Sequence, residues 1–157
     1  MDANKSFVHL SGRSSIKVAF VGNPNSGKST LFNALTGLNQ RTGNFPGVTV
    51  DKKVGNAKLS SGTIAEFVDL PGTYSLYPKS LDERVAVEVL CDPENPDHPD
   101  VTIVIADASN LKRNLFLVSQ IIDLKIPVIL ALNMMDMVEK EGAVIDRVRL
   151  SEKLGVK

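Results

Sequence analysis

The stretch GNPNSGKST, residues 22–30, follows directly on the apolar run IKVAFV and leads into a helix-like pattern. Gly22, Gly27, Lys28 and Ser29 satisfy the pattern G-x-x-x-x-G-K-[ST] of a phosphate-binding loop, with a strand before it and a helix after it. Such glycines let backbone N–H groups turn inward around a phosphate, the lysine can bridge the β- and γ-phosphates, and the serine hydroxyl can ligate Mg²⁺. The sequence therefore predicts a nucleotide site with Mg²⁺ as a cofactor. The residues expected to line it are Gly22, Asn23, Pro24, Asn25, Ser26, Gly27, Lys28, Ser29 and Thr30.

Strand-like runs recur along the chain and indicate the class of fold. VGNAKL (54–59) and TIAEFVDL (63–70) predict a hairpin that turns at residues 60–62. Continuous apolar runs are typical of buried parallel strands, and they stand at 17–21, 101–107 and 127–133. Alternation with helical patterns predicts an α/β fold with right-handed crossovers. We expect a P-loop NTPase with a mostly parallel sheet and one antiparallel hairpin strand.

Four helices are expected between and after these strands, from apolar residues at helical spacing and from capping residues. Gly37 predicts the end of the first, Ser80 and Glu83 a capping box for the second, and Asp146 and Gly155 the two ends of the last. The expected apolar faces are Leu31, Phe32 and Leu35; Leu81, Val85 and Val89; Leu111, Leu115, Val118 and Ile122; and Leu150 and Leu154.

Composition limits the function classes. The chain has 157 residues, 43% of them hydrophobic, which suits one domain with an ordinary core. Basic and acidic residues balance at 18 each, so charge gives no case for nucleic acid as a partner. The N-terminus lacks the apolar core of a signal peptide, and no apolar run approaches the roughly 20 residues of a membrane span. The proline-rich and acidic stretch 91–100 is interpreted as a surface loop.

The tetrapeptide NMMD, Asn133 to Asp136, follows a buried strand and indicates which base is bound. A carboxylate such as that of Asp136 can accept hydrogen bonds from guanine N1–H and from its 2-amino group, whereas adenine offers neither donor. Asn133 can brace the base and the phosphate loop. Met134 stands where the common N-K-x-D form has lysine, and with Met135 it completes the expected base loop. The predicted ligand is therefore GTP or GDP.

Two further segments are expected to sense the γ-phosphate. In DLPG, residues 69–72, Asp69 fits a residue that holds Mg²⁺ through water, and the Gly72 N–H can reach the γ-phosphate. In QRTGNFPGVTV, residues 40–50, Thr49 is the candidate for a second Mg²⁺ ligand beside Ser29. Together the segments predict an order–disorder switch. Besides Lys28, the nucleotide contacts expected from them are Gly47, Val48, Thr49, Asp69, Leu70, Pro71 and Gly72.

These motifs, in this order, resemble the translation-factor-type GTPases. The finer resemblance is to the N-terminal G domain of the ferrous iron transport protein B (FeoB) family, over residues 17–156. It is carried by GNPNSGKSTLFNALTG, NQRTGNFPGVTVDKK, VDLPGTYSL, DASNLKRNLFL and LALNMMD. The resemblance implies a Ras-like G domain and a slow, K⁺-stimulated GTPase that regulates a bacterial Fe²⁺ uptake transporter at the cytoplasmic face of the inner membrane. Helical and membrane domains of the same polypeptide, and small cytoplasmic Feo accessory proteins, are the partners it implies.

The resemblance also assigns a cation site and marks two departures. It implies that Asn25 coordinates K⁺ with the carbonyls of Gly43 and Phe45, which would make Asn25 a catalytic residue beside Lys28, Thr49 and Gly72. Phe45 stands where the family usually has tryptophan, and only its backbone is needed. Thr73 stands where Ras-like GTPases have a water-orienting glutamine, so we expect slow turnover and name no general base.

The family pattern further implies a strand and a guanine-covering loop after Lys157. We therefore expect a flexible segment over residues 1–15 and an incomplete G domain over 16–157, with weakened nucleotide affinity and an exposed sheet edge beside PVILAL. Two alternatives stay open. One is a soluble K⁺-dependent GTPase of ribosome assembly or tRNA modification, which the sequence beyond Lys157 would separate. The other is a guanine-nucleotide-binding regulatory module without hydrolysis, which phosphate release would separate.

Overall fold

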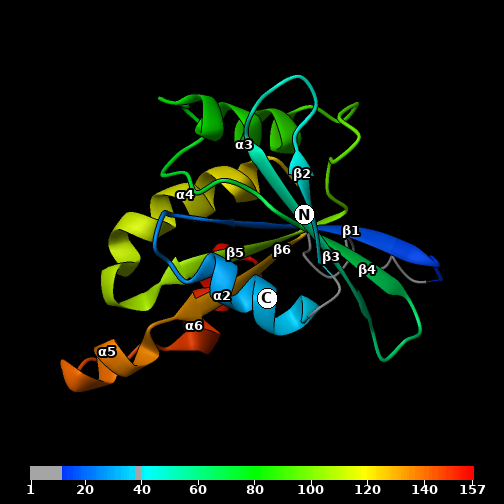
Figure 1. The fold of residues 1–157 in the computed structure, drawn as a ribbon. Helices are drawn as coiled ribbons and strands as arrows, with labels where there is room; N and C mark the ends of the chain where they lie inside the picture. Colours follow the sequence, from blue (N-terminus) through cyan, green and yellow to red (C-terminus); the bar gives the residue numbers. More distant parts are fainter. Residues whose placement is uncertain (1–11, 38–39) are drawn as a thin grey trace.

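A six-stranded sheet runs through the middle of the molecule in the order β2-β3-β4-β1-β5-β6 (Figure 1). The computed structural model describes residues 12–37 and 40–157. The strands are β1 (Ser15–Gly22), β2 (Gln40–Asn44), β3 (Asp51–Lys58), β4 (Ile64–Asp69), β5 (Val101–Asp107) and β6 (Val128–Asn133). In the described part of the chain only β3 runs against the others, because it pairs antiparallel with both β2 and β4. The predicted mostly parallel sheet with one antiparallel hairpin strand is confirmed.

The strand ends converge at one edge of the sheet. Phe20 stands beside Asp69, Gly22 beside Ile105, and Asp107 beside Asn133 in the parallel registers. Ligands of open α/β sheets bind outside the carboxyl ends of the strands. The reversed direction of β3 brings its beginning, rather than its end, to this same edge. The phosphate loop, DLPG and the NMMD loop therefore meet there, together with the segment that precedes β3.

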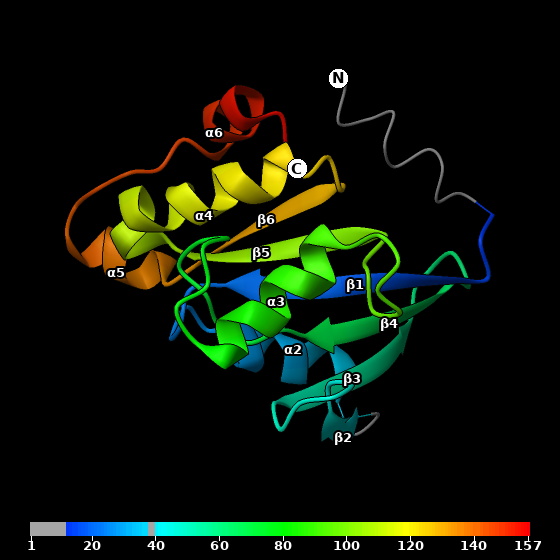
Figure 2. The same cartoon turned by 90° about the horizontal axis from the view of Figure 1, so that it is seen from above.

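Helices cover both faces of the sheet. They are α2 (Lys28–Thr36), α3 (Leu81–Cys91), α4 (Leu111–Asp123), α5 (Met135–Lys140) and α6 (Arg147–Leu154), with a 3₁₀ turn η1 (Ala108–Asn110) before α4. Figure 2 shows α3 and α4 in front of the strands and α2 behind them, with α6 beyond β6. The larger apolar cluster therefore joins the sheet to α3 and α4, and it includes Val21, Val68, Val85, Leu90, Leu117 and Ile121.

The smaller cluster packs α2 against the opposite face of the sheet. The Phe20 ring meets Phe32 of α2 edge-on at a centroid distance of 5.7 Å, and Phe67 of β4 at 5.4 Å. Gly55 of β3 also lies against this helix, because a Cβ there would stand 2.4 Å from Cγ2 of Thr36. The helix that follows the phosphate loop is thus fixed to three neighbouring strands, which holds the loop in place.

Most of the predicted caps are confirmed, whereas two predicted core positions are wrong. Ser80 accepts a hydrogen bond at Oγ from the N–H of Glu83 (3.2 Å), and the glutamate reaches back to the N–H of Lys79 rather than to that of Ser80. Asp146 and Gly155 cap α6 as predicted. Leu35 and Leu81, expected on apolar faces, are 45% and 48% exposed. Leu81 is the first residue of α3, one turn before the buried Val85, and in α2 the buried residues are Phe32 and Thr36.

Part of the segment predicted as a switch loop is a strand. Residues 40–44 form β2, which pairs with residues 51–55 of β3. The following residues fold back as a loop, in which the Phe45 N–H donates to the Val50 carbonyl (3.0 Å). β2 is the edge strand, and its sequence QRTGN has no apolar alternation that could have revealed it. It forms because β3 offers a ladder of backbone partners.

The two ends of the described part of the chain contact the sheet or its adjoining loop. Of the segment expected to be flexible, residues 1–11 lie outside the described part. Arg13 pairs with Asp100 at 2.5 Å, and Ser15 already belongs to β1. At the C-terminal end, the N–H of Leu130 in β6 donates to the carbonyl of Lys157 at 2.7 Å. The edge of β6 that was expected to be exposed therefore has a backbone partner at this position. No helix in residues 12–37 and 40–157 has the length and hydropathy needed to cross a membrane.

Candidate nucleotide-binding site

Two glycines of the phosphate loop are required by close contacts. A Cβ on Gly22 would stand 2.6 Å from the Ile105 carbonyl oxygen of β5. A Cβ on Gly27 would stand 2.0 Å from Nδ2 of Asn133, and Gly27 also has a φ of +89°, which favours glycine. The loop is therefore pressed against β5 and against the NMMD loop, with its backbone turned at the N-terminus of α2.

The loop surrounds a cavity of about 570 Å³, here called the loop cavity. Its volume is in the range of small-molecule sites. Gly72 of DLPG closes one side of it, because a Cβ there would meet atoms of Pro24 at 3.1 Å. Phosphate-loop, DLPG and base-loop residues thus share one space. Its lining residues are Asn23, Pro24, Asn25, Gly27, Lys28, Ser29, Thr30, Gly72 and Met134.

A second cavity of about 360 Å³, here called the switch cavity, adjoins the first through Lys28, which lines both. Thr49 reaches this cavity from the loop before β3, and Asp69 reaches it from the end of β4. Asp82, in the first turn of α3, also lines it and was not predicted from the sequence. The only sequence signal for Asp82 is an acid in a helical first turn, which is common on helices that bind nothing.

Asp69 is the polar centre of the site. Its Oδ1 accepts a hydrogen bond from Lys28 Nζ, and its Oδ2 accepts one from Ser29 Oγ at 3.2 Å. The side chains of Lys28 and Asp69 are only 11% and 6% exposed. A buried carboxylate beside a hydroxyl provides the oxygen ligands that Mg²⁺ prefers. These residues therefore fit a magnesium ion held next to a phosphate.

The base loop is joined to the phosphate loop. Asn133 donates from Nδ2 to the Ser26 carbonyl oxygen at 2.9 Å, and Met134 stands next to it with a positive φ of 58°. Asp136 is exposed and accepts a hydrogen bond from Lys140 at 3.4 Å, one helical turn away. Met135 points elsewhere, since it lines a separate cavity between β6 and α6.

Unsatisfied polar atoms also mark the phosphate loop. Among the described residues, the buried side-chain atoms without a hydrogen-bond partner are Asn23 Oδ1, Ser26 Oγ and Asn56 Oδ1. Two of these three belong to the phosphate loop, and both residues are at most 5% exposed. Buried polar groups are nearly always paired in proteins. Their concentration here is typical of a loop arranged around a polar ligand.

Of the three residues expected to hold K⁺, Asn25 is the one that lines the loop cavity. Asn25 is exposed, has a φ of +62° and lines the loop cavity. Gly43 lies in β2 and lines a different cavity with Asp51 and Lys53. The Phe45 carbonyl accepts a hydrogen bond from the Val48 N–H at 3.3 Å, and its ring is buried. Neither Gly47 nor Val48 lines the switch cavity, although Thr49 does.

Comparison with known proteins assigns the family. Residues 16–157 match the profile of the family described as Ferrous iron transport protein B. The chain belongs to this family. Its curated FeoB relatives include the Fe(2+) transporter FeoB of Salmonella typhimurium, 46% identical over 144 residues, and that of Legionella pneumophila, 49% identical over 139 residues. These matches cover 89% and 86% of the chain but only 18% of each relative, so the chain spans less than a fifth of their length.

Solved FeoB structures share the fold. The G domain of the T. maritima FeoB iron transporter superposes with a TM-score of 0.81 at 42% identity, covering 90% of this chain and 84% of that one. The cytosolic domain of L. pneumophila FeoB gives 0.82 at 48% identity, covering 90% and 58%. An S. thermophilus NFeoB mutant bound to mGDP gives 0.82 at 45% identity, covering 91% and 53%. The fold is therefore that of the FeoB G domain.

Proposed function

We propose that this chain binds GTP and hydrolyses it slowly, as the regulatory G domain of an Fe²⁺ uptake transporter. The observation that carries the proposal is the meeting of Lys28 and Ser29 at the buried Asp69 carboxylate, with Thr49 in the same cavity as Lys28 and Asp69. These residues come from three segments that a GTPase needs for the phosphates and the metal. The solved FeoB relatives include proteins bound to GDP or mGDP, which supports the choice of nucleotide.

Each proposed role follows from the chemistry of the residue. Lys28 would leave Asp69 to pair with the phosphates, and Ser29, Thr49 and Asp69 would hold Mg²⁺, with Asp69 acting through water. Bound Mg²⁺ neutralises charge that develops on the phosphoryl group. The Gly72 N–H would donate to the γ-phosphate from beside Pro24.

Guanine selection is proposed for the loop after β6. The Asp136 carboxylate would accept from the two donors of guanine. Asn133 already braces the phosphate loop through the Ser26 carbonyl, and Met134 would pack on the ring, since a thioether is soft and adaptable. The exposed position of Asp136 leaves its carboxylate free to exchange Lys140 for a base, because a surface ion pair of this kind contributes little.

Stimulation by K⁺ is proposed through Asn25, with the Gly43 and Phe45 carbonyls as further ligands. A cation beside the phosphates would stabilise charge in the transition state. Of these three proposed ligands, Asn25 is the one that lines the loop cavity in the described arrangement. Gly43 and Phe45 would have to move to join it.

The experiment measures GTP hydrolysis with Mg²⁺ in KCl and in NaCl at equal ionic strength, for the unaltered chain and for Asn25→Ala. Stimulation by K⁺ that disappears in the variant is the expected result. Hydrolysis indifferent to K⁺ would remove the role of Asn25. Bound guanine nucleotide with no hydrolysis in either salt would leave a binding module.

That module is the second candidate function, and one observation favours it. Thr73 is fully buried, and its Oγ1 donates to the Ser75 carbonyl at 2.7 Å. At the position where Ras-like GTPases orient water, the hydroxyl is therefore bonded to the backbone of its own segment. Multiple-turnover phosphate release decides between the two candidates. Family membership argues against the alternative of a ribosome-assembly or tRNA-modification GTPase.

The transport role is proposed from the relatives, which are named Fe(2+) transporters. In that role the chain would work at the cytoplasmic face of the bacterial inner membrane, joined to helical and membrane domains and meeting small Feo accessory proteins. Replacing the G domain of the Salmonella relative with this chain tests the role. Restored Fe²⁺ uptake that is lost again with Lys28→Ala would support it.

A further inference from the structure

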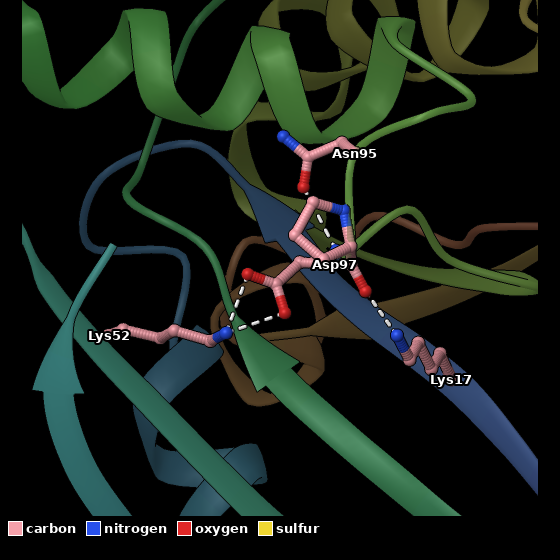
Figure 3. Close-up of polar contacts among 5 residues, drawn as sticks. Lys17, Lys52, Asn95 and Asp97 are labelled. Atoms are coloured by element: carbon pink, nitrogen blue, oxygen red, sulfur yellow. Dashed lines mark hydrogen bonds and ion pairs between the residues drawn. The ribbon is translucent and has the colours of Figure 1, made fainter. Parts of the chain in front are cut away.

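Lys52 and Asp97 form an ion pair away from the nucleotide cavities. Lys52 Nζ lies 2.5 and 2.6 Å from the two carboxylate oxygens of Asp97, as Figure 3 shows. The side chains are 22% and 8% exposed. The pair joins β3 to the stretch between α3 and β5, 45 residues along the chain. That stretch was predicted to be a surface loop, yet Asp97 is among the buried charged residues.

The stretch that carries Asp97 is itself held firmly. The N–H of Asp97 donates to Asn95 Oδ1 at 2.9 Å, and Lys17 of β1 donates from Nζ to the Pro96 carbonyl (Figure 3). Nδ1 of His98 lies 3.1 Å from the Val89 carbonyl of α3. These contacts with β1 and α3 fix the position of the stretch whose Asp97 carboxylate pairs with Lys52.

On its other side Lys52 meets the loop before β3. Its Nζ lies 5.7 Å from the centroid of the Phe45 ring. Phe45 closes the loop through its N–H bond to the Val50 carbonyl, and its carbonyl receives the Val48 N–H. Three residues of this closed loop are exposed, and of these three Thr49 is the one that lines the switch cavity with Lys28 and Asp69. The ion pair is thus connected, through the Phe45 ring, to the loop that carries Thr49.

We propose that Lys52 and Asp97 are positioning residues for the switch loop, residues 45–50. A buried ion pair is weak evidence for stability, but it favours one arrangement over others because an unpaired buried charge is costly. Here the arrangement favoured is the one in which Lys52 lies over the Phe45 ring and Thr49 lines the switch cavity with Asp69. The inference rests on the proposed function, in which Thr49 meets Mg²⁺ when the γ-phosphate is present.

A positioning role differs measurably from a merely stabilising one. Loss of the pair should weaken binding of a GTP analogue more than binding of GDP, because Thr49 is proposed to meet Mg²⁺ only when the γ-phosphate is present. A stabilising pair would lower the melting temperature and leave the ratio of the two dissociation constants unchanged. Changes at residues that couple two arrangements shift affinities by about two- to thirtyfold, and we expect the ratio to change by a factor in that range.

The experiment measures dissociation constants for fluorescent GDP and for a non-hydrolysable fluorescent GTP analogue, both with Mg²⁺. The variants are Asp97→Asn and Lys52→Met, with Lys52→Arg as the conservative variant and Lys52→Asp/Asp97→Lys as the exchanged pair. Lys58→Met is the matched control, since Lys58 is an exposed lysine at the far end of the same strand. Amide exchange at Phe45 and Val48 reports on the loop without any nucleotide.

The proposal expects a selective loss of analogue affinity and faster exchange of the two amides in Asp97→Asn and Lys52→Met. Lys52→Arg should restore both properties, and Lys58→Met should change neither. An equal loss for both nucleotides, or an unchanged ratio, would overturn it. If the unaltered chain binds no guanine nucleotide, the proposed function fails. In that case unchanged amide exchange in Asp97→Asn overturns the positioning role independently.

Discussion

Asn133 donates a hydrogen bond from Nδ2 to the Ser26 carbonyl oxygen at 2.9 Å, across 107 positions of sequence. The same nitrogen lies 2.0 Å from the position that a Cβ of Gly27 would occupy. The loop that follows β6 and the loop that follows β1 are therefore joined, so the base and phosphate contacts proposed for them would be set relative to each other before any ligand binds.

Gly27→Ala is expected to abolish nucleotide binding. The new Cβ would lie 2.0 Å from Asn133 Nδ2, and it would also strain a backbone with φ of +89°. Gly62→Ala is the matched control, because Gly62 has a φ of +87° in the hairpin turn with no atom within 4 Å of its Cβ position. The control should lower the melting temperature but keep fluorescent GDP binding. Equal binding by both variants would show that the contact with Asn133 has no consequence.

Asp136→Asn should lower GTP and GDP affinity at least tenfold, since a carboxamide cannot accept from both donors of guanine. The amide N–H₂ matches the 2-carbonyl of xanthine, so the variant should gain affinity for xanthosine diphosphate. Competition of both diphosphates against a fluorescent nucleotide measures this. Lys140→Ala, which removes only the exposed ion-pair partner, should leave the selectivity unchanged. Retained guanine preference in Asp136→Asn would remove Asp136 from the base site.

Lys28→Met should destabilise the nucleotide-free protein, because it leaves the buried Asp69 carboxylate without its cation. We expect a loss of about 3 to 5 kcal/mol in the free energy of unfolding. Asp69→Asn should cost less, since the flexible lysine can reach solvent. The double variant should recover part of the loss of Lys28→Met. Urea unfolding of the four proteins gives the coupling energy, and strict additivity would mean that the contact carries no stability.

Cys91 offers a pH-dependent reaction at a single position, because the chain has one cysteine. Burial raises the pKa of its thiol above the ordinary value, although the residue as a whole is exposed at the end of α3. Only the thiolate reacts with maleimide. Labelling at pH 7.5 should therefore be slower in the folded chain than in the same chain unfolded by urea, and it should speed up as the pH rises. Equal rates would contradict the raised pKa.

The sequence predicts well those elements whose signal is local. GNPNSGKST marks the phosphate loop by residue type and spacing, and the apolar runs at 101–107 and 127–133 mark β5 and β6 within a residue. Asp146 and Gly155 reveal the ends of α6, because caps act on neighbouring backbone groups. These features need no knowledge of the rest of the molecule.

Features that depend on distant partners were missed. β2 is a polar edge strand that exists through its pairing with β3, and its Gly43 lines a different cavity from the one that Asn25 lines. The pair of Lys52 and Asp97 has no spacing that a sequence pattern could reveal, since the two residues come together only when the stretch before β5 folds over the sheet. Asp82 reaches the switch cavity for the same kind of reason.

Because β3 runs antiparallel to its neighbours, the candidate site and the hairpin turn lie at opposite ends of this strand. Its first residues stand at the edge that carries Thr49 and Asp69, whereas the turn at residues 60–62 lies at the opposite end of the hairpin. That turn is exposed and is bonded mainly to its own neighbours. A peptide tag or a fluorophore can therefore be inserted at residues 60–62 to attach the domain to a surface, leaving the opposite edge open to solution.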